Sequence, residues 1–167
     1  MRCTLMYIEE MWKNYLLSLG EDSNSTDLFY ESWHFGNNEK DANELAQLTR
    51  QGIKQATSSL LDSFKAENEP LPKENDLHII TDWNKQPVCI IKISKVEIVK
   101  FKNITKEHAG IEGEGDLSLS YWRNCHLKYF KEDAKELGFS FTEDSYVVFM
   151  IFESVFAKDK RDRSITY

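Results

Sequence analysis

Two short segments of the sequence hold residue types that could do chemistry together. In Gly52–Ser59, Lys54 lies among small and apolar residues, and Thr57 follows three positions later. A lysine in such surroundings is expected to be partly desolvated, which suits a base or an electrostatic catalyst. The simpler interpretation is a lysine whose stem packs along a strand edge while its amine reaches water.

The second segment is an acidic loop, residues 112–116, in which glycines alternate with three carboxylates: Glu112, Glu114 and Asp116. Crowded like charges should raise the pKa of at least one carboxyl group and favour a nearby cation. Opposite charges in two sharply patterned loops predict that Lys54 and Glu112 form a pair in a cleft. The residues alone leave open which carboxylate faces Lys54, and a solvated acidic loop is the simpler interpretation.

The sequence contains none of the other common catalytic motifs that were considered. There is no phosphate-binding loop, no dinucleotide fingerprint, no serine-hydrolase elbow and no zinc-protease motif. The histidines are scattered, and only Cys125–His126 hints at a ligand pair, so no metal site is predicted. The cysteines are too widely spaced for a disulfide framework, which favours a reducing cytoplasm as the location: Cys3, Cys89 and Cys125.

The composition favours one globular domain. The 167 residues include 21 basic and 28 acidic side chains, for a formal net charge of −7, and 41% of the residues are hydrophobic. This balance opposes the broad basic surface of a protein that binds nucleic acid through many phosphates, so any such role must be local. No apolar run approaches the length of a membrane span, and early charged residues argue against a signal peptide.

Hydrophobic periodicity predicts an α+β domain. Helices are expected at 5–19, at 39–51 with a capping box at Asp41–Glu44, and from 119 onward. Strands are expected at 28–36, 77–83, 87–99 and 146–156, the last one buried on both faces, and prolines make 60–76 a linker. Strands joined by short turns, with helices between them, suggest a small, mostly antiparallel β-barrel with flanking helices.

Several motifs, taken in order along the chain, match one family. They are Leu45-Ala46, Gly52-Ile53-Lys54, Ala56-Thr57-Ser58-Ser59-Leu60, Glu69-Pro70-Leu71-Pro72, Phe101, His108-Ala109, the loop 112–116, Trp122-Arg123, His126 and Phe130. The pattern G-x-K-x-x-T at residues 52–57 resembles the signature of the ASCH domain family. The similarity spans roughly residues 33–156, and the N-terminal helix resembles the longer bacterial form of the family.

This resemblance implies a PUA-like β-barrel, a fold shared with domains that bind RNA and modified nucleotides. We expect a single domain over residues 1–156, followed by a charged, disordered tail at 157–167. Some small bacterial members remove the acetyl group from N4-acetylcytidine without a metal, and others are described as ribonucleases. Neither a metal nor another cofactor is expected.

The resemblance also assigns roles to residues. Lys54, Thr57 and Glu112 would be catalytic: Thr57 as nucleophile or as a hydroxyl that polarises the carbonyl, Lys54 as its base or oxyanion partner, and Glu112 as anchor or proton shuttle. Substrate-binding roles are expected for Trp33, Phe35, Ser58, Glu114 and Arg123.

Three functions are therefore weighed. The leading hypothesis is a cleft for RNA or a modified nucleoside, which hydrolyses a small nucleoside amide or RNA. The alternative is a non-catalytic RNA-binding or regulatory module, in which Lys54 contacts a phosphate and aromatic side chains stack on bases. A plain interaction domain has only the hydrophobic N-terminal helix in its favour. A monomer or a weak dimer is expected.

Overall fold

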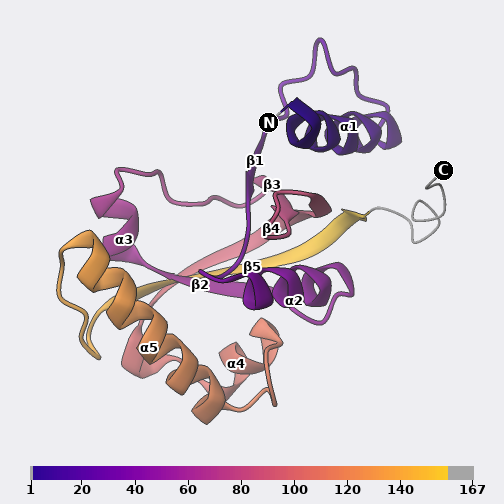
Figure 1. The fold of residues 1–167 in the computed structure, drawn as a ribbon. Coiled ribbons are helices and arrows are strands. Elements are labelled where there is room, and N and C mark those ends of the chain that lie inside the picture. Colours follow the sequence, from indigo (N-terminus) through magenta and orange to yellow (C-terminus); the bar gives the residue numbers. More distant parts are fainter. Residues whose placement is uncertain (1, 158–167) are drawn as a thin grey trace. The chain divides into compact units, whose positions relative to one another are not determined.

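The computed structural model describes residues 2–157, with side chains from residue 8 onward (Figure 1). The helices are α1 (Arg2–Ser18), α2 (Glu39–Arg50), α3 (Leu61–Ala66), the short 3₁₀ helix η1 (Phe101–Asn103), α4 (Lys106–Glu112) and α5 (Leu119–Leu137). The strands are β1 (Tyr30–Trp33), β2 (Ala56–Leu60), β3 (Leu77–Thr81), β4 (Pro87–Lys100) and β5 (Tyr146–Ala157). Apart from Ala157, the predicted tail lies outside the described residues.

The five strands form one sheet in the order β1-β3-β4-β5-β2. Strand β1 runs parallel to β3, whereas β3 and β4, and β2 and β5, pair antiparallel. The α+β class is thus confirmed, but the predicted barrel is wrong, because β1 and β2 lie at opposite edges of the sheet and do not pair to close it. Among the described residues, no helix is both long and apolar enough to cross a membrane.

The described chain divides into two compact units. The first contains residues 2–51, 77–92 and 154–157. Its core forms where the apolar side of α1 packs against β3 and β4: Ile8, Met11, Trp12, Tyr15, Leu16, Leu77, Ile79 and Ile90. The predicted N-terminal helix is therefore confirmed, and its apolar side chains are used inside this unit, which weakens the interaction-domain hypothesis.

Helix α2 also belongs to the first unit and begins at Glu39 as predicted, but its N-cap is Asn38, three residues before the predicted cap at Asp41. Asn38 has an extended backbone, and its side-chain oxygen accepts a hydrogen bond from the backbone N–H of Asp41 at 2.9 Å. Asn is a strong N-cap because its oxygen satisfies one of the free N–H groups of the first turn. Asp41 thus lies inside the helix, and the predicted capping box is wrong.

The second unit contains residues 52–76 and 93–153. Its core joins β2, η1, α4, α5 and β5 through a mainly aromatic and aliphatic cluster: Leu60, Phe101, Ile104, Ala109, Trp122, Phe130 and Val147. Helix α5 begins as predicted, with the Ser118 hydroxyl accepting the Tyr121 N–H at 3.1 Å. The predicted linker holds the six-residue helix α3 before its prolines. This unit contains both segments that were predicted to do chemistry.

Candidate functional site

Lys54 is a buried lysine two residues before the start of β2. Only 1% of the residue is exposed, so its amine does not reach water along a strand edge. The Nζ atom donates hydrogen bonds to the Ala56 carbonyl at 2.7 Å and to Glu114 Oε1 at 2.6 Å. The neighbouring backbone is held by the Gln55 N–H, which donates to the Ile111 carbonyl of α4 at 3.0 Å. The lysine is therefore fixed between β2 and the acidic loop.

The acidic loop starts where α4 ends, and glycine makes that ending possible. Gly113 caps α4 in the left-handed conformation, with φ of 73°. A β-carbon at this position would overlap the Ile53 carbonyl oxygen and lie 2.9 Å from the Lys54 α-carbon. Only glycine combines the positive φ with so close an approach of two backbones. Gly113 thus brings the loop against the lysine.

The structure shows which carboxylate faces Lys54. Glu114 accepts a hydrogen bond from Nζ, and Glu112 Oε1 lies 3.7 Å from Nζ. Asp116 instead accepts a hydrogen bond from the Ser118 N–H at 2.9 Å, at the start of α5. The predicted pair of Lys54 and Glu112 exists, but the shorter contact is with Glu114, whose side chain is 16% exposed.

Glu112 is fully buried and surrounded by donors. It accepts the Ser58 hydroxyl at 2.9 Å, the Trp122 indole N–H at 2.5 Å and His126 Nε2 at 3.0 Å. Burial alone would raise the pKa of Glu112, but the charges of His126 and Lys54 and these hydrogen bonds outweigh burial and hold it below its ordinary value. The shift is opposite to the one predicted for a crowded carboxyl group, because the loop faces two cations.

His126 is a member of this cluster that the sequence analysis did not assign. It is buried on α5, its Nδ1 lies 2.9 Å from the Trp122 carbonyl, and its ring stacks on the Trp122 indole with centroids 4.0 Å apart. Burial lowers the pKa of His126, but the charge and hydrogen bond of Glu112 outweigh burial and raise it overall. The signal in the sequence was the four-residue spacing Trp122, His126, Phe130, which puts all three on one helix face.

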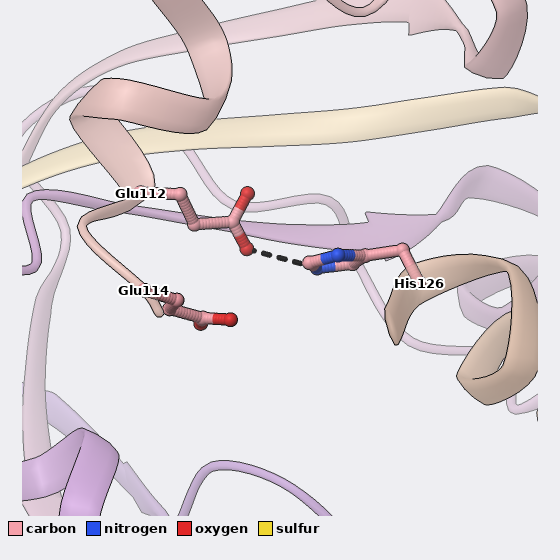
Figure 2. A group of neighbouring side chains, drawn as sticks. All are labelled: Glu112, Glu114 and His126. Carbon is pink, nitrogen blue, oxygen red and sulfur yellow. Dashed lines mark hydrogen bonds and ion pairs between the residues drawn. The ribbon is translucent and has the colours of Figure 1, made fainter. Parts of the chain in front are cut away.

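The same cluster contains a donor set for a cation. Glu112, Glu114 and His126 each offer one ligand atom, and these atoms lie within 4.8 Å of one another (Figure 2). Carboxylate and imidazole groups are common metal ligands. Here, however, the Lys54 ammonium already lies beside both carboxylates, so a metal ion would have to displace it. We therefore describe the cluster as an ion-pair network.

The remaining predicted site residues lie elsewhere. Thr57 is half-buried, and strand alternation directs its side chain to the opposite face of β2 from Ser58. Arg123 donates to both carboxylate oxygens of Glu143, at 2.7 and 2.9 Å, and its guanidinium lies over the Phe101 ring.

Two predicted aromatic residues belong to the first unit. Trp33 donates its indole N–H to His78 Nδ1 at 2.9 Å, and its ring meets that of Phe35 edge to face. Phe35 is buried, with 4% exposure. Their predicted role in substrate binding stays a prediction.

The arrangement favours one of the two chemical roles considered for Lys54. Nζ donates hydrogen bonds to two oxygens, and a second carboxylate lies 3.7 Å away, which suits a charged ammonium. A fixed ammonium can stabilise a developing oxyanion, whereas a general base would have to be neutral. Glu112 is held by three hydrogen bonds and forms an ion pair with the lysine at 3.7 Å, and Glu114 is the partly exposed carboxylate of the two.

Comparisons with known proteins agree with this fold. The model of the ASCH domain matches residues 31–156. An ASCH domain from Lactobacillus crispatus JV V101 is 30% identical with a TM-score of 0.82, over 93% of this chain and 96% of that one. A protein from Enterococcus faecalis V583, assigned to the DUF984 family, is 33% identical with a TM-score of 0.81, over 98% of both chains. None of the curated proteins compared with the chain matches it. The chain belongs to the ASCH domain family.

Proposed function

We propose that the Lys54 cluster binds RNA or a modified nucleoside, and that it hydrolyses an amide bond of the N4-acetylcytidine type. The observation that carries this proposal is a fully buried lysine held 2.6 Å from a carboxylate that is itself partly exposed. A buried charge is costly unless it is paired, and such arrangements concentrate at functional sites. Membership of a family related to RNA-binding domains supports a nucleic-acid or nucleoside ligand.

In the proposed reaction, the Lys54 ammonium stabilises the negative charge that develops on the amide oxygen. Ser58 is hydrogen-bonded to Glu112, and Thr57 lies on the opposite face of β2, so the proposed nucleophile is a water molecule and the predicted role of Thr57 stays a prediction. Water attacks the carbonyl carbon and gives a proton to Glu114, which passes it to the departing amine. The C–N bond of the amide then breaks, and the products are acetate and cytidine.

The net charge favours a small nucleoside over a long RNA as the substrate. A small neutral ligand needs no row of phosphate contacts, and the chain has a formal net charge of −7. Cleavage of RNA remains the second form of the hydrolase proposal. The non-catalytic RNA-binding module has less support, because binding through phosphates needs a group of cations and the chain carries more acidic than basic side chains.

The test is hydrolysis of N4-acetylcytidine by the purified protein, followed by the appearance of cytidine. Glu114→Gln keeps the size of the side chain and removes its charge, so we expect turnover to fall at least about a hundredfold. The matched control is Glu143→Gln, because Glu143 is also ion-paired but outside the cluster. Equal turnover in wild type and Glu114→Gln would refute the role of Glu114.

Absence of turnover in the wild type would refute the amidohydrolase proposal. A labelled single-stranded RNA is then the next ligand, with cleavage and binding measured across a salt series. Binding that weakens steeply with salt and without cleavage would establish the non-catalytic alternative, because phosphate contacts release counterions.

A further inference from the structure

We infer that His126 is a positioning residue of the Lys54 cluster: as an imidazolium fixed by Trp122, it holds Glu112 as a carboxylate and thereby keeps the Lys54 ammonium on Glu114. The expected effect on substrate turnover rests on the proposed function, whereas the protonation state of the cluster does not. His126 is not placed in contact with substrate, so it acts through Glu112 and Lys54.

The first step of the argument is the proton count on the ring. Nδ1 of His126 lies 2.9 Å from the Trp122 carbonyl, which can only accept a hydrogen bond, so Nδ1 carries a proton. Nε2 lies 3.0 Å from Glu112 Oε1. Because an ionised carboxylate also only accepts, Nε2 carries a proton as well, and the ring is an imidazolium.

The alternative assignment, a neutral ring beside a protonated Glu112, fits the surroundings less well. The other oxygen of that carboxyl group receives two donors, the Ser58 hydroxyl and the Trp122 indole N–H. The Lys54 ammonium adds a positive charge 3.7 Å from Oε1 of Glu112. All of these groups stabilise the ionised form of Glu112.

Trp122 fixes the His126 ring through two contacts and holds its partner Glu112 through a third. Its carbonyl accepts from Nδ1 of His126, its indole N–H donates to Glu112, and its ring stacks on the imidazole at an interplanar angle of 13°. An aromatic face beside a cation is favourable. One helical residue thus aligns the imidazolium with the carboxylate, and no further donor is needed to orient it.

The second step is charge balance. Lys54 and His126 supply two positive charges, and Glu112 and Glu114 supply two negative ones. If His126 loses its proton, one ammonium must serve two carboxylates, and Glu112 is the more deeply buried of the two. The lysine should then move toward Glu112 and weaken its bond to Glu114, which is the contact that the proposed reaction uses.

The first test needs no variant. In ¹⁵N-labelled wild-type protein at pH 7, we expect both ring nitrogens of His126 to show the chemical shifts of protonated nitrogen. One bare ring nitrogen would overturn the inference. His126→Gln assigns the signals, and the result is independent of any activity.

The second test follows the side-chain carboxyl carbon of Glu112 by ¹³C NMR as pH falls. We expect His126→Gln to raise the midpoint of its titration by about 1 pH unit or more, because a neutral amide replaces a cation. His108→Gln is the matched control, since His108 Nε2 lies 3.2 Å from Glu97 outside the cluster. An unchanged midpoint in His126→Gln would overturn the inference.

The third test is functional and uses the pH profile. Wild-type turnover of N4-acetylcytidine should fall as pH rises through the pKa of His126, above its ordinary value of 6.5. In His126→Gln we expect at least about tenfold lower turnover and the loss of that alkaline limb. A limb that persists in the variant would contradict the inference. A wild type without turnover would refute the proposed function, while the ring-nitrogen measurement would still decide the protonation of His126.

Discussion

Replacing Gly113 with alanine should lower the stability of the protein, and alanine variants of two other glycines serve as controls for the cause. Gly113 and Gly52 both have positive φ, 73° and 76°, but only a β-carbon at Gly113 would meet other atoms. Forcing a residue with a β-carbon into the left-handed conformation costs roughly 1–2 kcal/mol in either variant. The close approach to Ile53 and Lys54 is then the extra cost of Gly113→Ala.

The size of this extra cost follows from the contact distances. The separation of 2.9 Å from the Lys54 α-carbon is about 0.5 Å shorter than the 3.4 Å at which ordinary contact begins, and the Ile53 carbonyl is closer still. Both neighbours are backbone atoms, which cannot rotate away. Overpacking of this kind typically costs about 1–3 kcal/mol. We expect Gly113→Ala to lose about 2–5 kcal/mol in total, against about 1–2 kcal/mol for Gly52→Ala.

The assay is chemical denaturation of the wild type and three variants, combined with turnover of N4-acetylcytidine. Gly110→Ala is the third variant, because Gly110 lies inside α4 with nothing near its β-position, and alanine there should stabilise by about 0.5–1 kcal/mol. Misplacement of Lys54 should lower turnover in Gly113→Ala by about a hundredfold. Equal losses of stability in Gly113→Ala and Gly52→Ala would refute the argument that the loop is pressed against the lysine.

Three further predictions concern the cluster itself. Lys54→Met should cost about 3–5 kcal/mol of stability, because it leaves two carboxylates with His126 as their one cation in the cluster, and adding Glu112→Gln should recover part of that loss in denaturation experiments. Ser58→Ala should cost about 1–3 kcal/mol because it removes a buried donor to Glu112, whereas the half-buried neighbour in Ser59→Ala should cost no more than about 0.5 kcal/mol. The raised pKa of His126 stabilises the fold below pH 6.5, and this contribution is lost as pH rises through the pKa of His126 in the folded protein. The lowered pKa of Glu112 stabilises the fold above pH 4.5, and that contribution is lost as pH falls toward the pKa of Glu112 in the folded protein. Unfolding free energies at a series of pH values should therefore decline on both sides, and a flat alkaline side would contradict the charge assigned to His126.

Local sequence signals predicted most elements because each leaves a short-range pattern. The apolar spacing in residues 5–19 defines α1, and Ser118 marks the start of α5. Helix α3 was missed because it has six residues, no side-chain hydrogen bond at its cap and no buried residue, so it leaves no periodic pattern. Closure of a sheet depends on which strands end at its edges, which is a long-range property, and the predicted barrel failed for that reason.

The candidate site was predictable in part. Lys54 and the acidic loop stand out by composition, and their opposite charges led to the correct pairing. The choice of Glu114 over Asp116 depends on where Gly113 turns the backbone, which no pattern of charges reveals. His126 was overlooked because a histidine on an apolar helix face is usually a satisfied core residue, and its partner Glu112 lies on another helix.

The balanced charges of the cluster also constrain how the sequence can change over generations. Any single replacement of Lys54, Glu112 or His126 by a neutral residue leaves an excess charge inside the protein. The free-energy cost of that unpaired charge is a large part of the unfolding free energy of an ordinary domain. Two replacements of opposite sign together would avoid that excess. Substitutions at these positions should therefore be accepted in pairs, with the effect of each depending on whether its partner has already changed. The four charged side chains should therefore evolve together, because they are coupled in the structure.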